Sequence, residues 1–294
     1  MRDAANSSIR SDRPPAMRLG VVSYLNTLPL VAGLDRVPGV ELVPDVPARL
    51  ADRLVAGETD LSLCSVIDHQ RSEVPLDLVP VGQIGCEGET RTVALFSREP
   101  VDRLEKVACD VESHTSVALL RVILAERHGI RPRFVPFRDG DRTPDAVLLI
   151  GDKVSRLAPP VDSHPHRLDL GVEWLDLTGL PFVFAAWFRR ADPIDDDADR
   201  RVARLATLVD HARRRHRTLV PTIARREAAA HGWRVPDAIE YLGRLLRYEI
   251  TDRSIEAIRT FHELAARHGA IEELRPLRIT DGTGRVASRT LVSS

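Results

Sequence analysis

The segment Arg18–Leu30 has the sequence RLGVVSYLNTLPL, and the prediction of the fold starts from it. Its first five residues, Arg18–Val22, are mostly apolar and predict a short buried strand. The polar turn Ser23–Asn26 follows, and Asn26 is a residue type that caps helices. Pro29 then falls in the first turn of the expected helix, where a proline is well tolerated. The segment therefore predicts a strand, a turn and a helix in succession.

The same succession repeats downstream. Val40–Val43 predicts a second strand, and Pro47 opens a helix that ends at Gly57. Asp60–Val66 predicts a third strand that is nearly continuous in apolar residues, as strands inside parallel sheets are. Strands that alternate with helices at this spacing predict an α/β fold with a parallel sheet.

A second, smaller α/β unit is predicted at residues 98–189. It holds a helix through Val117–Leu124 and a proline-rich surface loop at Ala158–Pro165. The apolar stretch Phe182–Phe188 is expected to carry the chain back to the first unit. Strands are expected at Arg91–Ser97, just before this unit, and at Val107–Asp110, Phe134–Phe137 and Ala146–Ile150 within it.

The resulting layout has two lobes, and the chain passes between them twice. The expected parts are a disordered leader at 1–16, lobe I at 17–97 plus 190–279, lobe II at 98–189, and a flexible tail at 280–294. Helices are expected near the C-terminus at 198–216, 221–231, 236–247 and 252–269. This layout is typical of the two-lobed periplasmic-binding-protein-like (type II) α/β fold with a helical C-terminal region. Ligands of such folds lie between the lobes, near strand C-termini and helix N-termini.

The composition excludes several classes of protein. The 294 residues are 43% hydrophobic and 29% charged, with a formal net charge of −1, so the chain has no overall attraction for nucleic acids or acidic membranes. The basic run Ala212–Arg217 is interpreted as a solvated helix face. Met1–Ala16 has no apolar core of a secretory signal, and the longest apolar stretch, Leu180–Phe188, is too short to span a bilayer. We therefore expect a cytoplasmic protein.

The motifs of the common cofactor and metal sites are missing from the sequence. It contains no P-loop, no G-x-G-x-x-G, no H-E-x-x-H, no EF-hand loop and no G-x-S-x-G elbow. Cys64, Cys86 and Cys109 are odd in number and lack C-x-x-C spacing, which favours free, mostly buried thiols over disulfides or a zinc site. Chemistry without a cofactor or a metal, or simple binding, are the functions that remain.

Four polar turns follow predicted strands, at Ser23–Asn26, Ser65, Gly85–Thr92 and Ser113–Ser116. Hydroxyls and backbone amides at helix N-termini are suited to binding carboxylates. For each turn taken alone, a helix cap is the favoured interpretation. Four of them at the expected mouth of one cleft favour a binding site for an anionic small molecule that needs no arginine clamp.

Several segments along the chain carry a resemblance to a known family. They are Val22–Leu30, Leu50-Ala51, Gly57–Leu61, Val93–Ser97, Ser113–Ser116, Leu148–Asp152, Asp169–Gly171 and, most specific of all, Thr178–Trp187. In their order and spacing these segments resemble the chorismate dehydratases of the futalosine route to menaquinone. The resemblance covers about residues 17–270. The resemblance implies a hydro-lyase that removes water from chorismate to give 3-[(1-carboxyvinyl)oxy]benzoate. Formation of the aromatic ring drives the reaction, so no cofactor is implied, and the expected partner is the small-molecule substrate, with no nucleic acid, no membrane and no assigned oligomeric state.

The resemblance also implies site residues. Asn26 corresponds to the family's active-site asparagine, and Thr92 occupies a place where the family commonly has an active-site serine. Both are expected to be catalytic. Asp152 follows a strand and either faces the cleft or caps the next helix. The expected substrate-binding residues are Tyr24, Ser65, Ser113, Thr115, Ser116 and Asp152, and no metal ligand is expected.

The proton acceptor is not evident in the matched motifs, which lack a convincing histidine or glutamate base. His114 is interpreted as an exposed residue at a helix start. We hypothesise that the enolpyruvyl carboxylate of the substrate takes the proton, oriented by Asn26 and Thr92. The alternatives are a non-catalytic binder of an aromatic or carboxylate small molecule, and the related lyase that forms 1,4-dihydroxy-6-naphthoate. A regulatory domain is a third alternative, but no DNA-binding module accompanies it.

Overall fold

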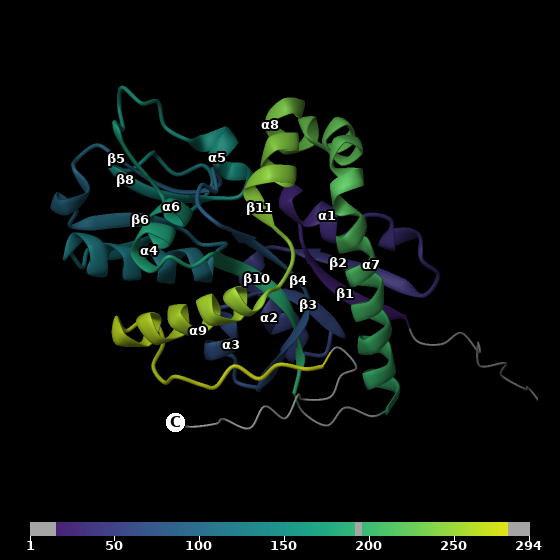
Figure 1. Ribbon diagram of the computed structural model, residues 1–294. Coiled ribbons are helices and arrows are strands. Elements are labelled where there is room, and N and C mark those ends of the chain that lie inside the picture. Colours follow the sequence, from purple (N-terminus) through teal and green to yellow (C-terminus); the bar gives the residue numbers. More distant parts are fainter. Residues whose placement is uncertain (1–15, 192–195, 282–294) are drawn as a thin grey trace, which may run out of the picture.

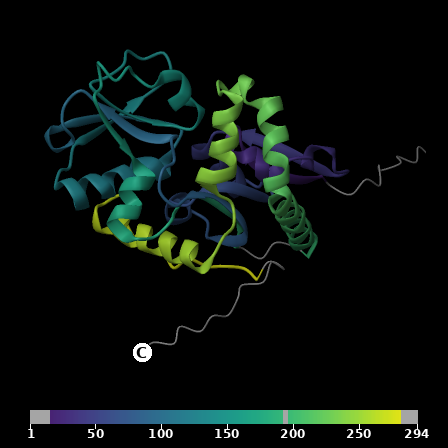
Figure 2. The same cartoon turned by 45° about the horizontal axis from the view of Figure 1, so that its top comes forward.

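The computed structural model describes residues 16–191 and 196–281, which fold into two lobes, each built on its own β-sheet (Figure 1). The first lobe is the part built on the six-stranded sheet, and the second lobe is the part built on the five-stranded sheet. Figure 2 shows the same two bodies from another direction, with the long helix α7 on the far side of the first lobe from the second.

The six-stranded sheet has the order β11-β4-β10-β3-β1-β2. Strand β1 runs parallel to both β2 and β3, whereas β10 runs antiparallel to β3 and β4, and β11 antiparallel to β4. Leu19, Leu63 and Trp187, from three neighbouring strands, are fully buried in its core. The strands are β1 (Met17–Val22), β2 (Val40–Asp45), β3 (Leu61–Ser65), β4 (Leu76–Cys86), β10 (Phe182–Arg190) and β11 (Leu246–Arg247).

The five-stranded sheet has the order β7-β6-β8-β5-β9. Its strand β5 runs antiparallel to both of its neighbours, and β6 runs parallel to both of its own. The strands are β5 (Val93–Ser97), β6 (Lys106–Asp110), β7 (Arg133–Phe137), β8 (Ala146–Ile150) and β9 (His166–Asp169).

The helices cover both sheets and join the lobes. Helix α7 packs on α1 and β4, while α9 contacts α4 of the second lobe as well as β10 of the first. The helices are α1 (Leu28–Val31), α2 (Pro47–Val55), α3 (Asp68–Arg71), α4 (His114–His128), α5 (Asp152–Leu157), α6 (Leu170–Thr178), α7 (Asp196–Glu227), α8 (Val235–Glu240) and α9 (Asp252–Arg267). One π turn, Tyr241–Leu245, follows α8 directly. No described helix combines the length and the apolar character that a membrane span needs.

Most predicted elements are confirmed, but the predicted parallel sheet is not parallel throughout. Strands β1, β2 and β3 lie where they were expected, and the prediction for β8 is correct at both ends. Both sheets are mixed, because β10 runs antiparallel to β3 and β4 in the first sheet and β5 runs antiparallel to both of its neighbours in the second. Strand β4 was not predicted at all, since Pro80, Gly82 and Gly85 are residues that signal loops.

The helical C-terminal region differs from the prediction in two places. Helix α7 continues through Pro221, so the expected break between 216 and 221 is wrong. Buried side chains on both sides of the proline, Ala212, Val220 and Ile223, hold the helix against the lobe despite the missing backbone hydrogen bond. The predicted helix 236–247 ends early, in the π turn and then in β11.

The change from one sheet to the other falls earlier in the chain than the expected lobe boundaries. Strand β5, placed in lobe I by the expectation, belongs to the second sheet, and β10, placed in lobe II, belongs to the first. Phe182–Phe188 does carry the chain back to the first lobe, as predicted. The three cysteines are free and buried. The expected leader and tail lie almost wholly outside the described residues.

Candidate functional site

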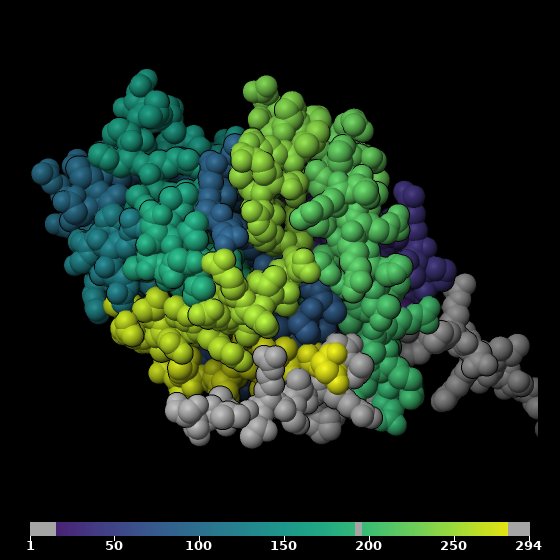
Figure 3. Space-filling view, viewed as in Figure 1, coloured from purple at the N-terminus to yellow at the C-terminus, as the bar shows by residue number. Residues whose placement is uncertain are grey.

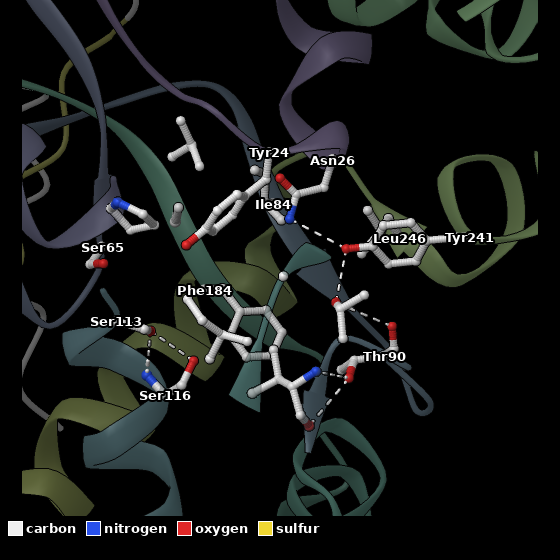
Figure 4. Close-up of a pocket in the computed structure, with 17 residues that line it drawn as sticks. Tyr24, Asn26, Ser65, Ile84, Thr90, Ser113, Ser116, Phe184, Tyr241 and Leu246 are labelled. Atoms are coloured by element: carbon white, nitrogen blue, oxygen red, sulfur yellow. Dashed lines mark hydrogen bonds between the residues drawn. The ribbon is translucent and has the colours of Figure 1, made fainter. Parts of the chain in front are cut away.

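A pocket of about 530 Å³, including its open mouth, lies between the two sheets (Figure 4). Residues of both lobes form its wall, and Tyr241 of the π turn and Leu246 of β11 close one side. Of the described residues, those that line the pocket include no Asp, Glu, His, Lys, Arg or Cys. The wall consists of Val22, Tyr24, Asn26, Pro47, Ser65, Ile84, Thr90, Thr92, Val93, Ser113, Ser116, Ile150, Gly151, Phe184, Ala185, Tyr241 and Leu246.

The polar side chains gather at two ends of this pocket. In Figure 4, Ser65, Ser113 and Ser116 lie at one end, and Asn26 and Tyr241 lie at the other. The apolar side chains of Ile84 and Phe184 lie between these ends. A ligand with an apolar middle and a polar group at each end therefore matches the wall.

The turn after β1 places Tyr24 and Asn26 on the wall. The ring of Tyr24 rests on Gly151, where a Cβ atom would lie 2.8 Å from the ring, so only glycine fits there. The Tyr24 hydroxyl donates to the carboxylate of Glu112, which also pairs with Lys153. Burial and the neighbouring Glu112 raise the pKa of Tyr24, so its hydroxyl stays protonated.

Asn26 was expected to cap the helix, and the structure shows that this expectation is wrong. Asn26 lies inside a short 3₁₀ turn, Leu25–Thr27, and the residue at the cap position of α1, Thr27, makes no side-chain cap. The Asn26 Nδ2 atom instead donates to the Tyr241 hydroxyl at 3.3 Å. The amide is therefore directed to the pocket side of the turn, where a substrate would lie.

The loop before β5 presents Thr92, and the carboxylate of Asp169 holds that loop. Asp169 accepts hydrogen bonds from the backbone N–H groups of Thr90 at 3.0 Å and Arg91 at 2.8 Å, and from the Thr90 hydroxyl at 3.1 Å. It also caps α6 through the N–H of Gly171 at 3.1 Å. Arg91 has φ of 61°, which is uncommon for a residue with a side chain. One carboxylate thus fixes an unusual loop whose last residue is Thr92.

The Thr92 hydroxyl faces the same partner as Asn26. Its Oγ1 lies 2.9 Å from the Tyr241 hydroxyl and 3.5 Å from the Thr90 carbonyl oxygen. The structure therefore brings the two expected catalytic residues together, with Tyr241 between them.

The start of α4 supplies the opposite end of the pocket. The Ser113 hydroxyl accepts from the Ser116 N–H at 3.2 Å and donates to the Ser116 hydroxyl at 2.8 Å. Ser65, the last residue of β3, lies on the same part of the wall. The N-terminus of a 15-residue helix carries partial positive charge, so this end suits a carboxylate.

Two of the expected substrate-binding residues do not line the pocket. The Thr115 hydroxyl accepts from the Ile67 N–H at 3.3 Å. The Asp152 carboxylate accepts from the Leu25 N–H at 3.2 Å, from His231 Nδ1 at 2.6 Å and from Trp233 Nε1 at 2.9 Å. Both residues use their polar atoms to join the second lobe to other parts of the chain, which favours a structural role over contact with a substrate.

His114 also lies off the pocket wall. Its Nδ1 is 2.7 Å from Asp68 Oδ1, and its side chain is 42% exposed. The hydrogen bond with Asp68 raises the pKa of His114. Its position agrees with the interpretation as an exposed residue at a helix start, and it pairs the two lobes.

Tyr241 is the main wall residue that the sequence did not predict. It lies in a stretch expected to be a plain helix, far along the chain from Asn26 and Thr92. The local sign of a functional residue here is the π turn, which breaks the helix before Leu246, because π turns often occur at functional sites. No group of three or more His, Cys, Asp or Glu residues in the described parts of the chain could hold a metal ion.

Solved structures of similar shape share only the fold with this chain. The CA3427 gene product of Candida albicans, described as having the generic periplasmic binding protein fold, matches with a TM-score of 0.65 and 12% identity, over 89% of this chain and 92% of that one. The alkanesulfonate-binding protein SsuA of Xanthomonas axonopodis pv. citri matches with a TM-score of 0.63 and 15% identity, over 89% and 96%. The chain therefore has the periplasmic-binding-protein-like fold.

Sequence comparisons are more specific. A family model described as menaquinone biosynthesis matches residues 17–267. A chorismate dehydratase of Thermus thermophilus is 37% identical over 193 residues, which cover 60% of this chain and 70% of the relative. A chorismate dehydratase of Campylobacter jejuni is 28% identical over 177 residues, which cover 58% and 66%. The chain belongs to the chorismate dehydratase family of menaquinone biosynthesis.

Proposed function

We propose that the protein is a chorismate dehydratase, a carbon–oxygen lyase that converts chorismate to 3-[(1-carboxyvinyl)oxy]benzoate without a cofactor. The observation that carries this proposal is the pocket between the lobes, with hydroxyls and a helix N-terminus at one end and the Asn26–Thr92 pair at the other. Chorismate is a ring with two carboxylates, one on the ring and one on the enolpyruvyl group, and this shape matches two polar ends with an apolar middle.

The ring carboxylate is proposed to bind at the start of α4. Ser65, Ser113 and Ser116 offer hydroxyl groups there, and the helix N-terminus contributes roughly 0.3–1 kcal/mol when exposed and about 2 kcal/mol when partly buried. Phe184 and Ile84 would then contact the ring, and the reacting carbons would face Asn26 and Thr92. A dianion is held in this arrangement by dipoles and hydrogen bonds.

The base is proposed to be the substrate itself. Tyr24 and Tyr241 are the titratable side chains on the described wall, and burial raises the pKa of both, so neither accepts a proton near neutral pH. The enolpyruvyl carboxylate takes the proton from the ring carbon that bears the ether oxygen. The electron pair of that C–H bond forms the new ring double bond, and hydroxide leaves from the adjacent carbon. The leaving hydroxide takes up the abstracted proton from the newly formed carboxylic acid and becomes water. Asn26 and Thr92 orient the carboxylate for this step.

The test is incubation of the purified protein with chorismate, followed by ultraviolet absorbance and mass spectrometry. We expect loss of one water and appearance of an aromatic product. Unchanged chorismate that nevertheless binds would contradict the proposal and favour a non-catalytic binder. We expect Asn26→Ala to lower kcat by about 100-fold, because the carboxylate that takes the proton would lose its orientation.

His114→Ala is the control for the identity of the base. Its side chain lies off the pocket wall, so this variant should keep kcat near the wild-type value, and loss of its contact with Asp68 between the lobes should affect KM alone. If His114→Ala abolished turnover while chorismate still bound, a protein base would replace the substrate carboxylate in the mechanism. A cytoplasmic location stays a prediction from the sequence.

A further inference from the structure

The Tyr241 hydroxyl connects the two residues to which the proposed function assigns catalysis (Figure 4). Asn26 belongs to the first lobe, and Thr92 lies at the entry to the second sheet, one residue before β5. The Tyr241 side chain is 1% exposed and lines the pocket. Its oxygen therefore bridges the cleft between the lobes at the place where the reacting atoms would lie.

Either hydroxyl can donate in the bond between Tyr241 and Thr92, and one assignment of donors uses every group of the bridge. The amide nitrogen of Asn26 can only donate, so the Tyr241 oxygen accepts from it at 3.3 Å. The Tyr241 O–H is then free to donate to Thr92 Oγ1 at 2.9 Å. Thr92 keeps its own proton to donate, and its internal acceptor, the Thr90 carbonyl, is 3.5 Å away. A substrate oxygen at a normal distance of about 2.8 Å would be a better acceptor than that carbonyl.

The protonation state of Tyr241 agrees with this direction. Burial raises its pKa above the usual value, so the phenol stays neutral and keeps the proton that it donates. A phenolate would reverse the bridge, because Thr92 would then have to donate to Tyr241. The Thr92 hydroxyl would no longer be available to a substrate.

The position of Tyr241 is fixed from the second lobe. Its ring stacks on Trp233, with centroids 4.7 Å apart and planes 9° from parallel. The Trp233 indole N–H donates to Asp152, which follows β8 of the second lobe. In the space-filling view, α8 and the π turn stand between the second lobe and α7 (Figure 3). Contact between the lobes therefore orients the Tyr241 ring as well as enclosing the pocket.

We propose that Tyr241 is a positioning residue for the dehydration: it fixes the Thr92 hydroxyl as a hydrogen-bond donor toward the substrate and aligns it with Asn26 across the cleft. This inference rests on the proposed function. The bond to Tyr241 restrains the rotation of the Thr92 hydroxyl.

The test compares Tyr241→Phe with Tyr248→Phe. Tyr248 is a matched control, since it is 2% exposed and its hydroxyl has no hydrogen-bond partner among the described residues. Each variant removes one buried phenol oxygen and keeps the ring. We expect Tyr241→Phe to lower kcat by about 10- to 100-fold, the loss that a misplaced catalytic group causes, with KM near the wild-type value. Tyr248→Phe should keep the wild-type kcat and KM.

A double-mutant cycle shows whether Tyr241 acts through Thr92. In a Thr92→Val background, Tyr241→Phe should add a smaller loss of kcat than it causes alone, because the hydroxyl that it orients is already absent. If the loss of kcat in the double variant equalled the product of the losses in the two single variants, the inference would be overturned. A Tyr241→Phe enzyme with the wild-type kcat would also overturn it, as would one in which a higher KM and a lower melting temperature account for the whole effect. If the wild-type protein does not dehydrate chorismate, the proposed function fails and this inference fails with it, whereas an active wild type confines the failure to Tyr241.

Discussion

Gly171 leaves no room for a side chain where α6 meets the loop that presents Thr92. A Cβ atom at this position would lie 2.3 Å from the Gly88 carbonyl oxygen and 2.5 Å from Thr90 Cγ2. Asp169, two residues earlier, holds the same loop through the N–H groups of Thr90 and Arg91. The segment Asp169–Gly171 therefore shapes the active-site loop from a distance, without lining the pocket itself.

Gly171→Ala should displace the loop and with it Thr92. We expect a loss of about 1–3 kcal/mol of stability from overpacking, and a fall in kcat of about 100-fold if Thr92 moves by about 1 Å. Thermal unfolding and steady-state kinetics measure the two effects. Gly243→Ala is the control, because a Cβ there meets only Val220 Cγ1 at an ordinary 3.5 Å. Equal kinetics of the two variants would show that the close packing at Gly171 does not position Thr92.

At this scale the sequence predicted some residues and missed others for a physical reason. Asn26 and Thr92 lie in segments whose order and residue types resemble a family, so both were predicted. Tyr241 contacts them across 215 and 149 residues of chain, and no local pattern encodes such a contact. Asp152 was expected on the pocket wall because it follows a strand, but the donors that bind its carboxylate come from Leu25, His231 and Trp233, which only the fold brings together.

At the scale of elements, α3 and α9 meet in a buried pair of histidines. The rings of His69 and His262 stack with centroids 5.7 Å apart, and both Nδ1 atoms face the Gln70 side-chain nitrogen, at 3.1 and 3.0 Å. His262 Nε2 faces the Val66 carbonyl at 2.9 Å. Burial lowers the pKa of His69 from 6.5 to about 3 and that of His262 from 6.5 to about 4.

This pair predicts loss of stability in acid. The unfolded chain binds protons on these histidines near pH 6.5, whereas the folded chain does not until much lower pH. The free energy of unfolding is therefore intact above about pH 6.5 and falls as the pH drops toward 4, by up to about 1.4 kcal/mol per pH unit for each histidine. Denaturant unfolding at a series of pH values measures this slope. His69→Phe should flatten it, and His211→Gln, a change at an exposed histidine, should not.

Prediction of elements succeeded where side chains alternate or repeat regularly and failed where tertiary packing decides. Helix α4 was predictable from the residues at its two ends. Ser113 caps its N-terminus, and Gly129 ends it in the left-handed conformation that favours glycine. Strand β4 contains Pro80 and two glycines, and it forms because β10 supplies its pairing partner. Pro221 would end an isolated helix, but the contacts of α7 with α1 and β4 keep the helix continuous.

At the scale of the whole molecule, several hydrogen bonds cross between the lobes. Asp152 accepts from Leu25, His231 and Trp233. Tyr24 donates to Glu112, and His114 pairs with Asp68. These contacts hold the lobes in the arrangement that encloses the pocket.

Asp152→Ala should favour a more open molecule. Donors that remain buried without a partner would each disfavour the closed arrangement by about 1–3 kcal/mol. We expect a larger radius of gyration in small-angle X-ray scattering and a higher KM, because binding must then close the lobes. Asp145→Ala, which removes an exposed partner of Arg98 within the second lobe, is the control. An unchanged scattering profile for Asp152→Ala would contradict this role.

The fold as a whole followed from the order of the elements. Two α/β units with a return near Phe182 sufficed to predict a two-lobed periplasmic-binding-protein-like architecture, because the connections between such units are few. The direction of β10 did not follow, since a run of apolar residues carries no information about which way a strand enters a sheet.

The neutral wall of the pocket has a consequence for how the protein responds to its surroundings. Dipoles of hydroxyl groups and of a helix do not titrate, so their contribution to binding an anion does not change with pH wherever the fold is intact. Ionisation of the ligand then governs both affinity and rate, and the environment acts on the reaction through the small molecule and not through the protein. An uncharged wall of this kind also distinguishes charged from neutral ligands. A neutral analogue of the ligand would keep the apolar contacts in the middle of the pocket but would lose the interactions of its charges with the dipoles at both ends.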